Sequence, residues 1–215
     1  MAYRRKRNYR RKRTPWYRKK YSAITLAKKA YSGVKYIRGL VNSEMFDVVT
    51  TGNNYAITNT GGVVHLSNIA QDDGSTGRTG NSILAKSLFY RFVMKCHASA
   101  TVSTVRVIFL WDTQQVADTS PAVSSILQST DPLSALSLSV EGRFTIIKDY
   151  TFTLDNITKK SFAIKNFCSL NKHIRFNGST GSDIQKNGLY LMCISDEATN
   201  TPTISYNCKL SYHDN

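Results

Sequence analysis

Apolar and polar residues alternate along most of the chain after residue 44, which is typical of strands with one buried face. Segments 87–97 and 203–213 each carry apolar residues at every second position along one face, with mostly polar residues opposite in 203–213, and 104–111 and 143–154 alternate over shorter stretches. Weaker candidates are 45–58, 62–69, 161–168, 173–177 and 188–195. The predicted buried faces are Leu88, Tyr90, Phe92, Met94 and Cys96; Val105, Val107, Phe109 and Trp111; and Ile204, Tyr206, Cys208, Leu210 and Tyr212.

These segments give about eight or nine strands, separated by Gly, Asn and Asp, with one short helix at Val123–Gln128. Regularly spaced strands with turn residues between them predict an all-β, antiparallel sandwich or barrel. Lys148 falls on the apolar face of 143–154. This position indicates either a β-bulge or a paired charge.

Residues 22–40 follow a different period. Ile24, Ala27, Tyr31 and Val34 recur at helical spacing, and Ser22 is placed to cap the first turn. The apolar stripe is too small to fold alone. A basic amphipathic helix can lie on a membrane, but we favour packing against other copies or against the body, because this segment runs directly into the strand-rich region.

The excess positive charge lies at one end of the chain. Residues 1–43 contain 15 of the 29 Lys and Arg and no acidic residue, since the first carboxylate is Glu44. The remaining residues hold 14 basic and 14 acidic side chains, so the body is formally neutral. A neutral body with a long cationic arm is typical of a protein whose arm binds a polyanion.

The arm has the composition of a single-stranded nucleic-acid binder. Eleven of residues 3–20 are Lys or Arg, and we expect such a run to be disordered without a counterion. The interleaved aromatic residues offer surfaces on which unstacked bases can stack. The candidate nucleic-acid-binding residues are Arg4, Arg5, Lys6, Arg7, Arg10, Arg11, Lys12, Arg13, Trp16, Tyr17, Arg18, Lys19, Lys20, Lys28 and Lys29. The alternatives are a nuclear-import signal, which is compatible with nucleic-acid binding, or a solubilising tail.

Other classes of protein have less support. No apolar run approaches the roughly 20 residues of a membrane helix, and no apolar h-region follows the basic residues, so we predict neither a membrane protein nor a secretory signal. Cys96, Cys168, Cys193 and Cys208 form no CxxC pair, which favours reduced, buried thiols over disulfides or a metal site. The histidines form no HxH or HExxH motif, and GxSxG and P-loop motifs are absent, so we predict no enzyme.

Asp72 and Asp73 are adjacent carboxylates in a polar loop. We favour their pairing with Arg78 or with a neighbouring subunit. The alternatives are a structural Ca²⁺ site and, least supported, a catalytic pair. We therefore predict no cofactor other than this candidate Ca²⁺.

Several segments resemble the coat protein of satellite tobacco necrosis virus and the capsid proteins of small circular single-stranded DNA viruses. They are Asp72-Asp73 followed by Gly77-Arg78-Thr79-Gly80, the strand Ile83–Met94, Val105–Trp111, and the Arg143-Phe144-Thr145-Ile146-Ile147-Lys148-Asp149 run, which is the most specific. The likeness spans roughly residues 22–215. Residues 3–20, in contrast, resemble the Arg-rich tails of circovirus capsid proteins.

The resemblance implies three parts: a disordered arm (1–21), an amphipathic helix (22–41) and an eight-stranded jelly-roll capsid domain (42–215). It also implies that sixty copies close a T=1 icosahedral shell around single-stranded nucleic acid, and the circovirus-like tail favours DNA over RNA. The expected locations are the virion and, during assembly, the host nucleus, with the import machinery as a further partner. The alternative is a cellular nucleic-acid-binding protein of ribosomal or chromatin type.

Overall fold

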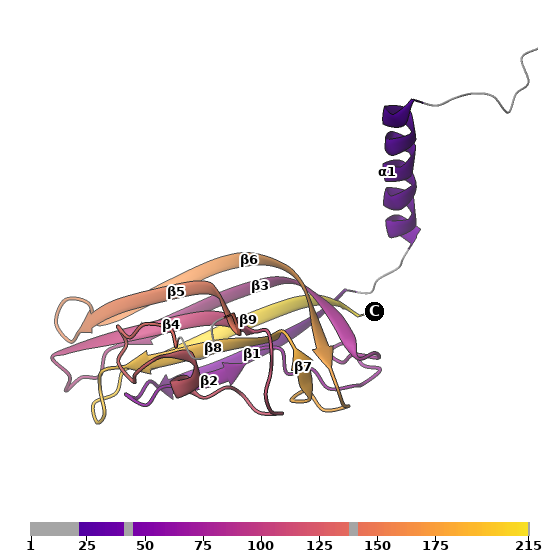
Figure 1. The fold of residues 1–215 in the computed structure, drawn as a ribbon. Coiled ribbons are helices and arrows are strands. Elements are labelled where there is room, and N and C mark those ends of the chain that lie inside the picture. The colour runs from indigo at the N-terminus through magenta and orange to yellow at the C-terminus, as the bar shows by residue number, and fades with distance from the viewer. Residues whose placement is uncertain (1–21, 41–44, 138–141, 215) are drawn as a thin grey trace, which may run out of the picture. The chain divides into compact units, whose positions relative to one another are not determined.

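The computed structural model describes residues 22–40, 45–137 and 142–214 (Figure 1). The chain divides into two units, Met1–Asn42 and Ser43–Asn215. The described part of the first unit is one helix, α1 (Ala23–Leu40), and the second unit is the β-rich body.

The body contains two antiparallel sheets (Figure 1). The five-stranded sheet has the order β1 (Met45–Ala56), β9 (Thr203–Asp214), β3 (Ser82–Lys95), β6 (Ser161–Phe176) and β7 (Ile184–Lys186). The four-stranded sheet has the order β2 (Gly62–His65), β8 (Gly188–Ser195), β4 (Val102–Asp112) and β5 (Phe144–Asp155). Neighbouring strands come from distant parts of the sequence, as in a double Greek-key jelly roll. The predicted all-β jelly-roll class is thus confirmed.

The most regular segments form strands close to their predicted bounds. The structure has nine strands among its described residues, within the eight or nine that the pattern predicts and one more than the resemblance implies. The three-residue edge strand β7 is not among the predicted segments, because it is too short to alternate. The candidates 161–168 and 173–177 are one strand, β6. Its register against β3 shifts between Ala85 and Ser87, and Asn171 takes a positive φ of 47° at this irregularity. The shift interrupts the alternation that the sequence shows. The short helix is α2 (Val123–Ile126).

The core lies between the two sheets and contains the predicted faces of β3, β4 and β9. Aromatic rings are at its centre: the centroids of Tyr90 and Phe109 are 4.1 Å apart. The Tyr90 and Tyr150 hydroxyl oxygens are 2.7 Å apart, and the Asn166 amide donates to the Tyr150 hydroxyl at 3.0 Å. Burial of large apolar rings is the main stabilising contribution, and these hydrogen bonds satisfy the polar ends of the buried tyrosines.

The predicted bulge is present in β5. Phe109 pairs with Lys148 and Leu110 pairs with Ile146, so Ile147 is the extra residue. Ile147 packs against the core, whereas Ile146 packs on the outer side of the four-stranded sheet. The bulge therefore shifts the alternation of the strand: Phe144 and Ile146 pack on the outer side before it, whereas Tyr150 and Phe152 pack against the core after it. Lys148 is exposed.

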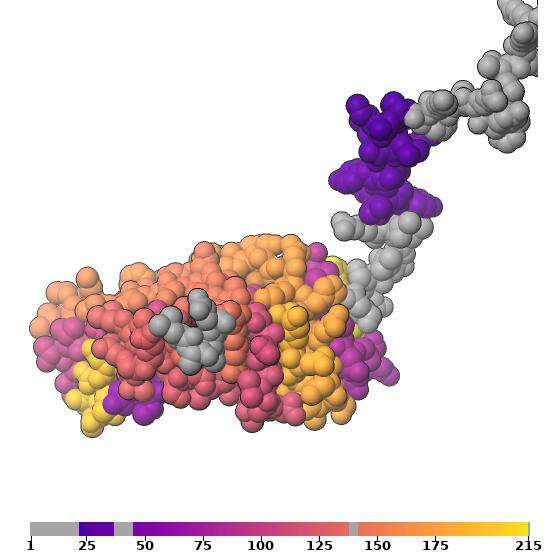
Figure 2. All heavy atoms as spheres, viewed as in Figure 1, coloured from indigo at the N-terminus to yellow at the C-terminus, as the bar shows by residue number. Residues whose placement is uncertain are grey.

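The outer side of the four-stranded sheet is covered by the chain between β4 and β5. Val123, Ile126 and Leu127 from this connection pack with Ile108 and Met192 of the sheet in a second apolar cluster. Figure 2 shows this connection, in pink and red, at the surface of the body beside the orange segments. The outer side of the five-stranded sheet contributes no residue to this cluster, and many of its side chains are exposed.

Candidate nucleic-acid interface

Helix α1 begins with the predicted cap. The Thr25 backbone N–H donates to Ser22 Oγ at 3.3 Å, and the Leu26 N–H donates to the Ser22 carbonyl at 3.0 Å. The Ser22 side chain thus satisfies one amide group of the first turn that has no backbone partner within the helix, and its carbonyl accepts the first helical hydrogen bond. The cap explains why the helix starts at Ala23, close to the predicted bound of residue 22.

The exposed side chains of α1 are both apolar and basic. Ile24 is 69% exposed and Tyr31 is 73% exposed. They lie seven positions apart and therefore share one side of the helix, flanked by exposed Lys28 and Lys35. Exposed apolar side chains at this spacing are typical of a helix that packs against a partner.

Two of the candidate nucleic-acid-binding residues, Lys28 and Lys29, are described, and both side chains are exposed on α1. The others lie outside the described residues; they are Arg4, Arg5, Lys6, Arg7, Arg10, Arg11, Lys12, Arg13, Trp16, Tyr17, Arg18, Lys19 and Lys20. Their role in binding nucleic acid stays a prediction.

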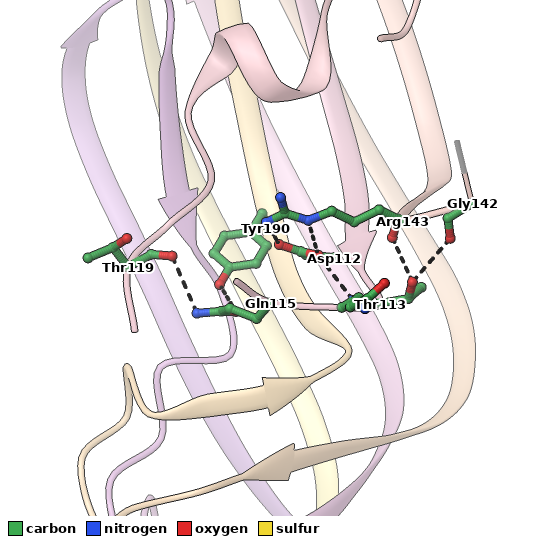
Figure 3. A network of polar contacts seen from close by, with 8 residues as sticks. Asp112, Thr113, Gln115, Thr119, Gly142, Arg143 and Tyr190 are labelled. Atoms are coloured by element: carbon green, nitrogen blue, oxygen red, sulfur yellow. Dashed lines mark hydrogen bonds and ion pairs between the residues drawn. The ribbon is translucent and has the colours of Figure 1, made fainter. Parts of the chain in front are cut away.

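In the body, the segment from Arg143 to Asp149 is anchored at its first residue by a buried ion pair (Figure 3). Arg143 donates from Nε to Asp112 Oδ1 at 2.8 Å and from Nη2 to Oδ2 at 2.6 Å. The Asp112 side chain is fully buried. These hydrogen bonds raise the pKa of the Arg143 guanidinium. Nearby, the Tyr190 hydroxyl donates to Gln115 Oε1 at 2.7 Å.

The last residue of the same segment is anchored in a similar way. Arg106 donates from Nε and Nη2 to the two carboxylate oxygens of Asp149 at 2.9 and 2.6 Å. Its Nη1 donates to the carbonyls of Pro132 and Ser134 at 3.1 and 2.5 Å. The two ion pairs clamp β5 onto β4 at both ends of this segment. Arg143 and Asp149 therefore have a structural role.

Arg78 is the largest fully buried side chain. Its guanidinium donates to the carbonyls of Ile69 at 2.9 Å and Gly80 at 2.6 Å, and also to the carbonyls of Gly178 and Thr180. It stacks on the Phe176 ring at 3.9 Å. The planar fork of donors ties the loop before β3 to the loop after β6.

The predicted pairing of Asp72 or Asp73 with Arg78 is wrong, whereas the alternative, pairing with a neighbouring subunit, stays a prediction. The Arg78 donors are used by backbone carbonyls, and its contact with Asp72 joins the Asp72 N–H to the Arg78 carbonyl at 3.1 Å. The sequence missed this because burial within a loop has no periodic signal. In the part of the chain that the structure describes, no three His, Cys, Asp or Glu side chains gather as metal ligands, so Ca²⁺ at Asp72 and Asp73 stays a prediction.

The four cysteines are free; Cys96 is half-buried and the other three are buried. Burial raises the pKa of the Cys208 thiol to about 12, and it also raises that of Cys193. Thiols in such surroundings stay protonated and poorly reactive. Among the described residues, no helix has the length and hydropathy needed to cross a membrane.

The family described as satellite tobacco necrosis virus coat protein matches residues 18–215. The match includes the capped helix and the whole described body. The chain belongs to this coat-protein family. As a coat protein, the chain has a structural role and is located in the virion. The family implies that it assembles with other copies of itself. The match does not extend to the circovirus resemblance of residues 3–20.

Solved structures similar to this coat protein also come from viruses. A chain of Desmodium yellow mottle tymovirus is 10% identical with a TM-score of 0.38, over 79% of this chain and 85% of that one. A chain of the empty head of turnip yellow mosaic virus is 15% identical with a TM-score of 0.40, over 80% and 82% respectively. The sequence matches no curated protein.

The uneven division of charge between the two sheets was not predicted from the sequence, because the body as a whole is formally neutral. The strands of the five-stranded sheet hold Lys86, Arg91, Lys95, Lys165, Lys172, Arg175, Lys186 and Lys209 but only two carboxylates, Asp47 and Asp214. The strands of the four-stranded sheet hold Arg106, Lys148, Asp112, Asp149 and Asp155. The first sheet therefore has an excess of six positive charges and the second an excess of one negative charge.

Proposed function

We propose that this coat protein assembles as sixty copies in a T=1 icosahedral shell and packages single-stranded nucleic acid, preferentially circular DNA. The observation that carries the proposal is the charge division: residues 1–43 hold 15 basic side chains and no acidic one, ahead of a formally neutral body. Phosphate neutralisation by such an arm is independent of sequence, as genome packaging requires.

The charge of the arms fits a small genome. Sixty arms carry about 900 positive charges, comparable to the phosphates of a genome on the order of 1 kb. The arm's Arg and aromatic residues favour unpaired bases over a duplex, because bases that are not stacked in a helix are free to stack on side chains. The same basic run has the composition of a nuclear-import signal, which supports assembly in the host nucleus.

The exposed stripe of α1 supports a second part of the proposal. Ile24, Leu26, Tyr31 and Val34 are all more than half exposed in the single chain. We infer that copies of α1 pack together beneath the shell, which buries Ile24 and Tyr31. Lys28 and Lys35 lie on the same side of the helix, so their long side chains extend past this contact to reach nucleic acid.

The test is to purify particles from cells that express the full chain, treat them with nuclease, and sequence what is protected. We expect a mass of about 1.4 MDa of protein, from sixty chains of 24.1 kDa, together with protected single-stranded DNA. Protected RNA would overturn the choice of DNA. Particles consistently free of nucleic acid would overturn packaging, and a small oligomer would overturn the shell.

A further inference from the structure

Two cations face each other on the outer side of the five-stranded sheet. Arg91 of β3 and Lys165 of β6 are directly opposed in the register, and both are exposed. Arg91 is also opposite Asn207 of β9, which is opposite Thr51 of β1, so this row contains no carboxylate. Directly opposed like charges are destabilising. The repulsion between these two cations therefore lowers the stability of the sheet at this position, and a bound anionic ligand would reduce this repulsion.

The same arrangement occurs a second time in this sheet. Arg175 of β6 is opposed to Lys186 of β7, and both are exposed. One of the two carboxylates on these strands, Asp47, already accepts from Lys209 at 2.7 Å. The other, Asp214, accepts from the backbone N–H and the hydroxyl of Thr79. Neither carboxylate lies beside an opposed cation pair in the register.

Aromatic rings accompany the first cation pair. The Arg91 guanidinium lies 5.3 Å and the Lys165 ammonium 5.7 Å from the centroid of the Phe89 ring. Phe89 is opposed to Phe167 in the register, and Phe167 is 61% exposed. The exposed Phe167 ring, two positions from Lys165 along β6, offers a stacking surface next to phosphate ligands.

A groove of about 560 Å³ runs across the four strands at this position. Arg91 and Lys165 line it, together with the small or short side chains of Thr51, Ala163, Ser205 and Asn207. Its lining comes from β1, β9, β3 and β6, so it crosses the sheet instead of following one strand. Its volume is in the range of small-ligand sites and can hold a nucleotide-sized group.

We propose that this face is a second nucleic-acid site, distinct from the arm, where Arg91 and Lys165 bind phosphodiesters and Phe167 stacks a base. The inference rests on the proposed packaging function and extends it to the body. The chain's own residues 1–43 are poor occupants because they are basic and contain no carboxylate, so the face would repel them. Single-stranded nucleic acid supplies both the anionic charge and the free base.

The test uses the full-length protein and a single-stranded oligo-dT containing photoreactive thymidine analogues. The variant is Arg91→Gln with Lys165→Gln, and the matched control is Lys159→Gln with Lys160→Gln, which removes two exposed cations from the β5–β6 connection. We expect crosslinks at peptides of the arm and at the peptide containing Phe167 in the wild type. The variant should lose the Phe167 crosslink. The slope of the logarithm of its binding constant against the logarithm of the salt concentration should fall in magnitude by about 1.4, because two phosphate contacts are lost. The control should keep both wild-type values.

Crosslinks restricted to the arm, with equal salt slopes for all three proteins, would overturn the second site and leave the proposed function intact. A wild type that does not bind oligo-dT at all would overturn both. Normal oligo-dT binding by the variant combined with loss of high-mass particles would overturn the inference in favour of a protein–protein contact, such as one with the acidic loops of a second copy.

Discussion

Arg143 and Asp112 form a bidentate ion pair, in which Nε and Nη2 of Arg143 donate to the two carboxylate oxygens at 2.8 and 2.6 Å. The Asp112 side chain is fully buried. The pair joins Arg143, the residue just before β5, to Asp112, the last residue of β4. The backbone N–H of Gln114 also donates to Asp112 at 3.2 Å. Each partner therefore depends on the other, because neither charge has enough water around it to be stable alone.

We predict that Arg143→Met lowers the free energy of unfolding by about 3–5 kcal/mol, because it leaves the buried Asp112 carboxylate without its cation. Urea denaturation followed by tryptophan fluorescence measures the change. The double variant Arg143→Met with Asp112→Leu should recover most of the loss, since it removes both charges. A single variant as stable as the wild type would contradict the role of this pair.

A second prediction concerns Arg78. Arg78→Lys should destabilise the body by at least about 3 kcal/mol, because a lysine cannot reach the several carbonyls of two loops that the planar guanidinium bonds. Limited proteolysis should then cut near Gly178 or Asp72 before it cuts elsewhere. The exposed Arg91→Lys is the matched control and should have little effect. Equal thermal midpoints for Arg78→Lys and Arg91→Lys would contradict the prediction.

His65 gives a pH-dependent prediction. Burial lowers its pKa from 6.5 to about 4, and its ring stacks on Tyr190 with centroids 4.8 Å apart. The unfolded chain therefore binds more protons between these pH values, so stability is full above about 6.5 and falls as pH drops toward 4. The loss from this group is at most about 3 kcal/mol.

The measurement is the free energy of unfolding at several pH values for the wild type and for His65→Phe, which retains a ring against Tyr190 but does not titrate. The difference between the two proteins should change between pH 6.5 and pH 4 and be flat above pH 7. Parallel pH curves would show that His65 makes no contribution.

The fourth prediction concerns assembly through α1. Ile24→Asp with Leu26→Asp should strongly reduce particle yield, because two carboxylates would have to be buried where copies of the helix pack. Circular dichroism should show a body that is still folded, since α1 lies outside the unit Ser43–Asn215. The control, Lys28→Gln with Lys35→Gln, should form particles that contain less nucleic acid. Unchanged yield for the aspartate variant would mean that the stripe is not an interface.

The sequence alone determined most of the strands and the helix cap, and it indicated the bulge as one of two alternatives for Lys148, because each has a local signal. Alternation in 203–213 predicts one buried face, and Ile204, Tyr206, Cys208, Leu210 and Tyr212 are all buried there. Ser22 caps α1, and Lys148 marks the bulge beside Ile147. The arm's charge is likewise a property of composition, and it stays the basis for the proposed binding of nucleic acid.

Only the tertiary structure decided which charges meet. Arg91 and Lys165 are 74 positions apart, and pairing of β3 with β6 places them opposite each other on one face. The same pairing of distant strands and loops buries Arg78 among carbonyls, away from Asp72 and Asp73. The net charge of the body is a sum over all its residues, so a value of zero does not show how the charges are distributed over the faces of the two sheets. The register between strands that are distant in sequence decides which charged side chains become neighbours, and local sequence patterns do not encode this register.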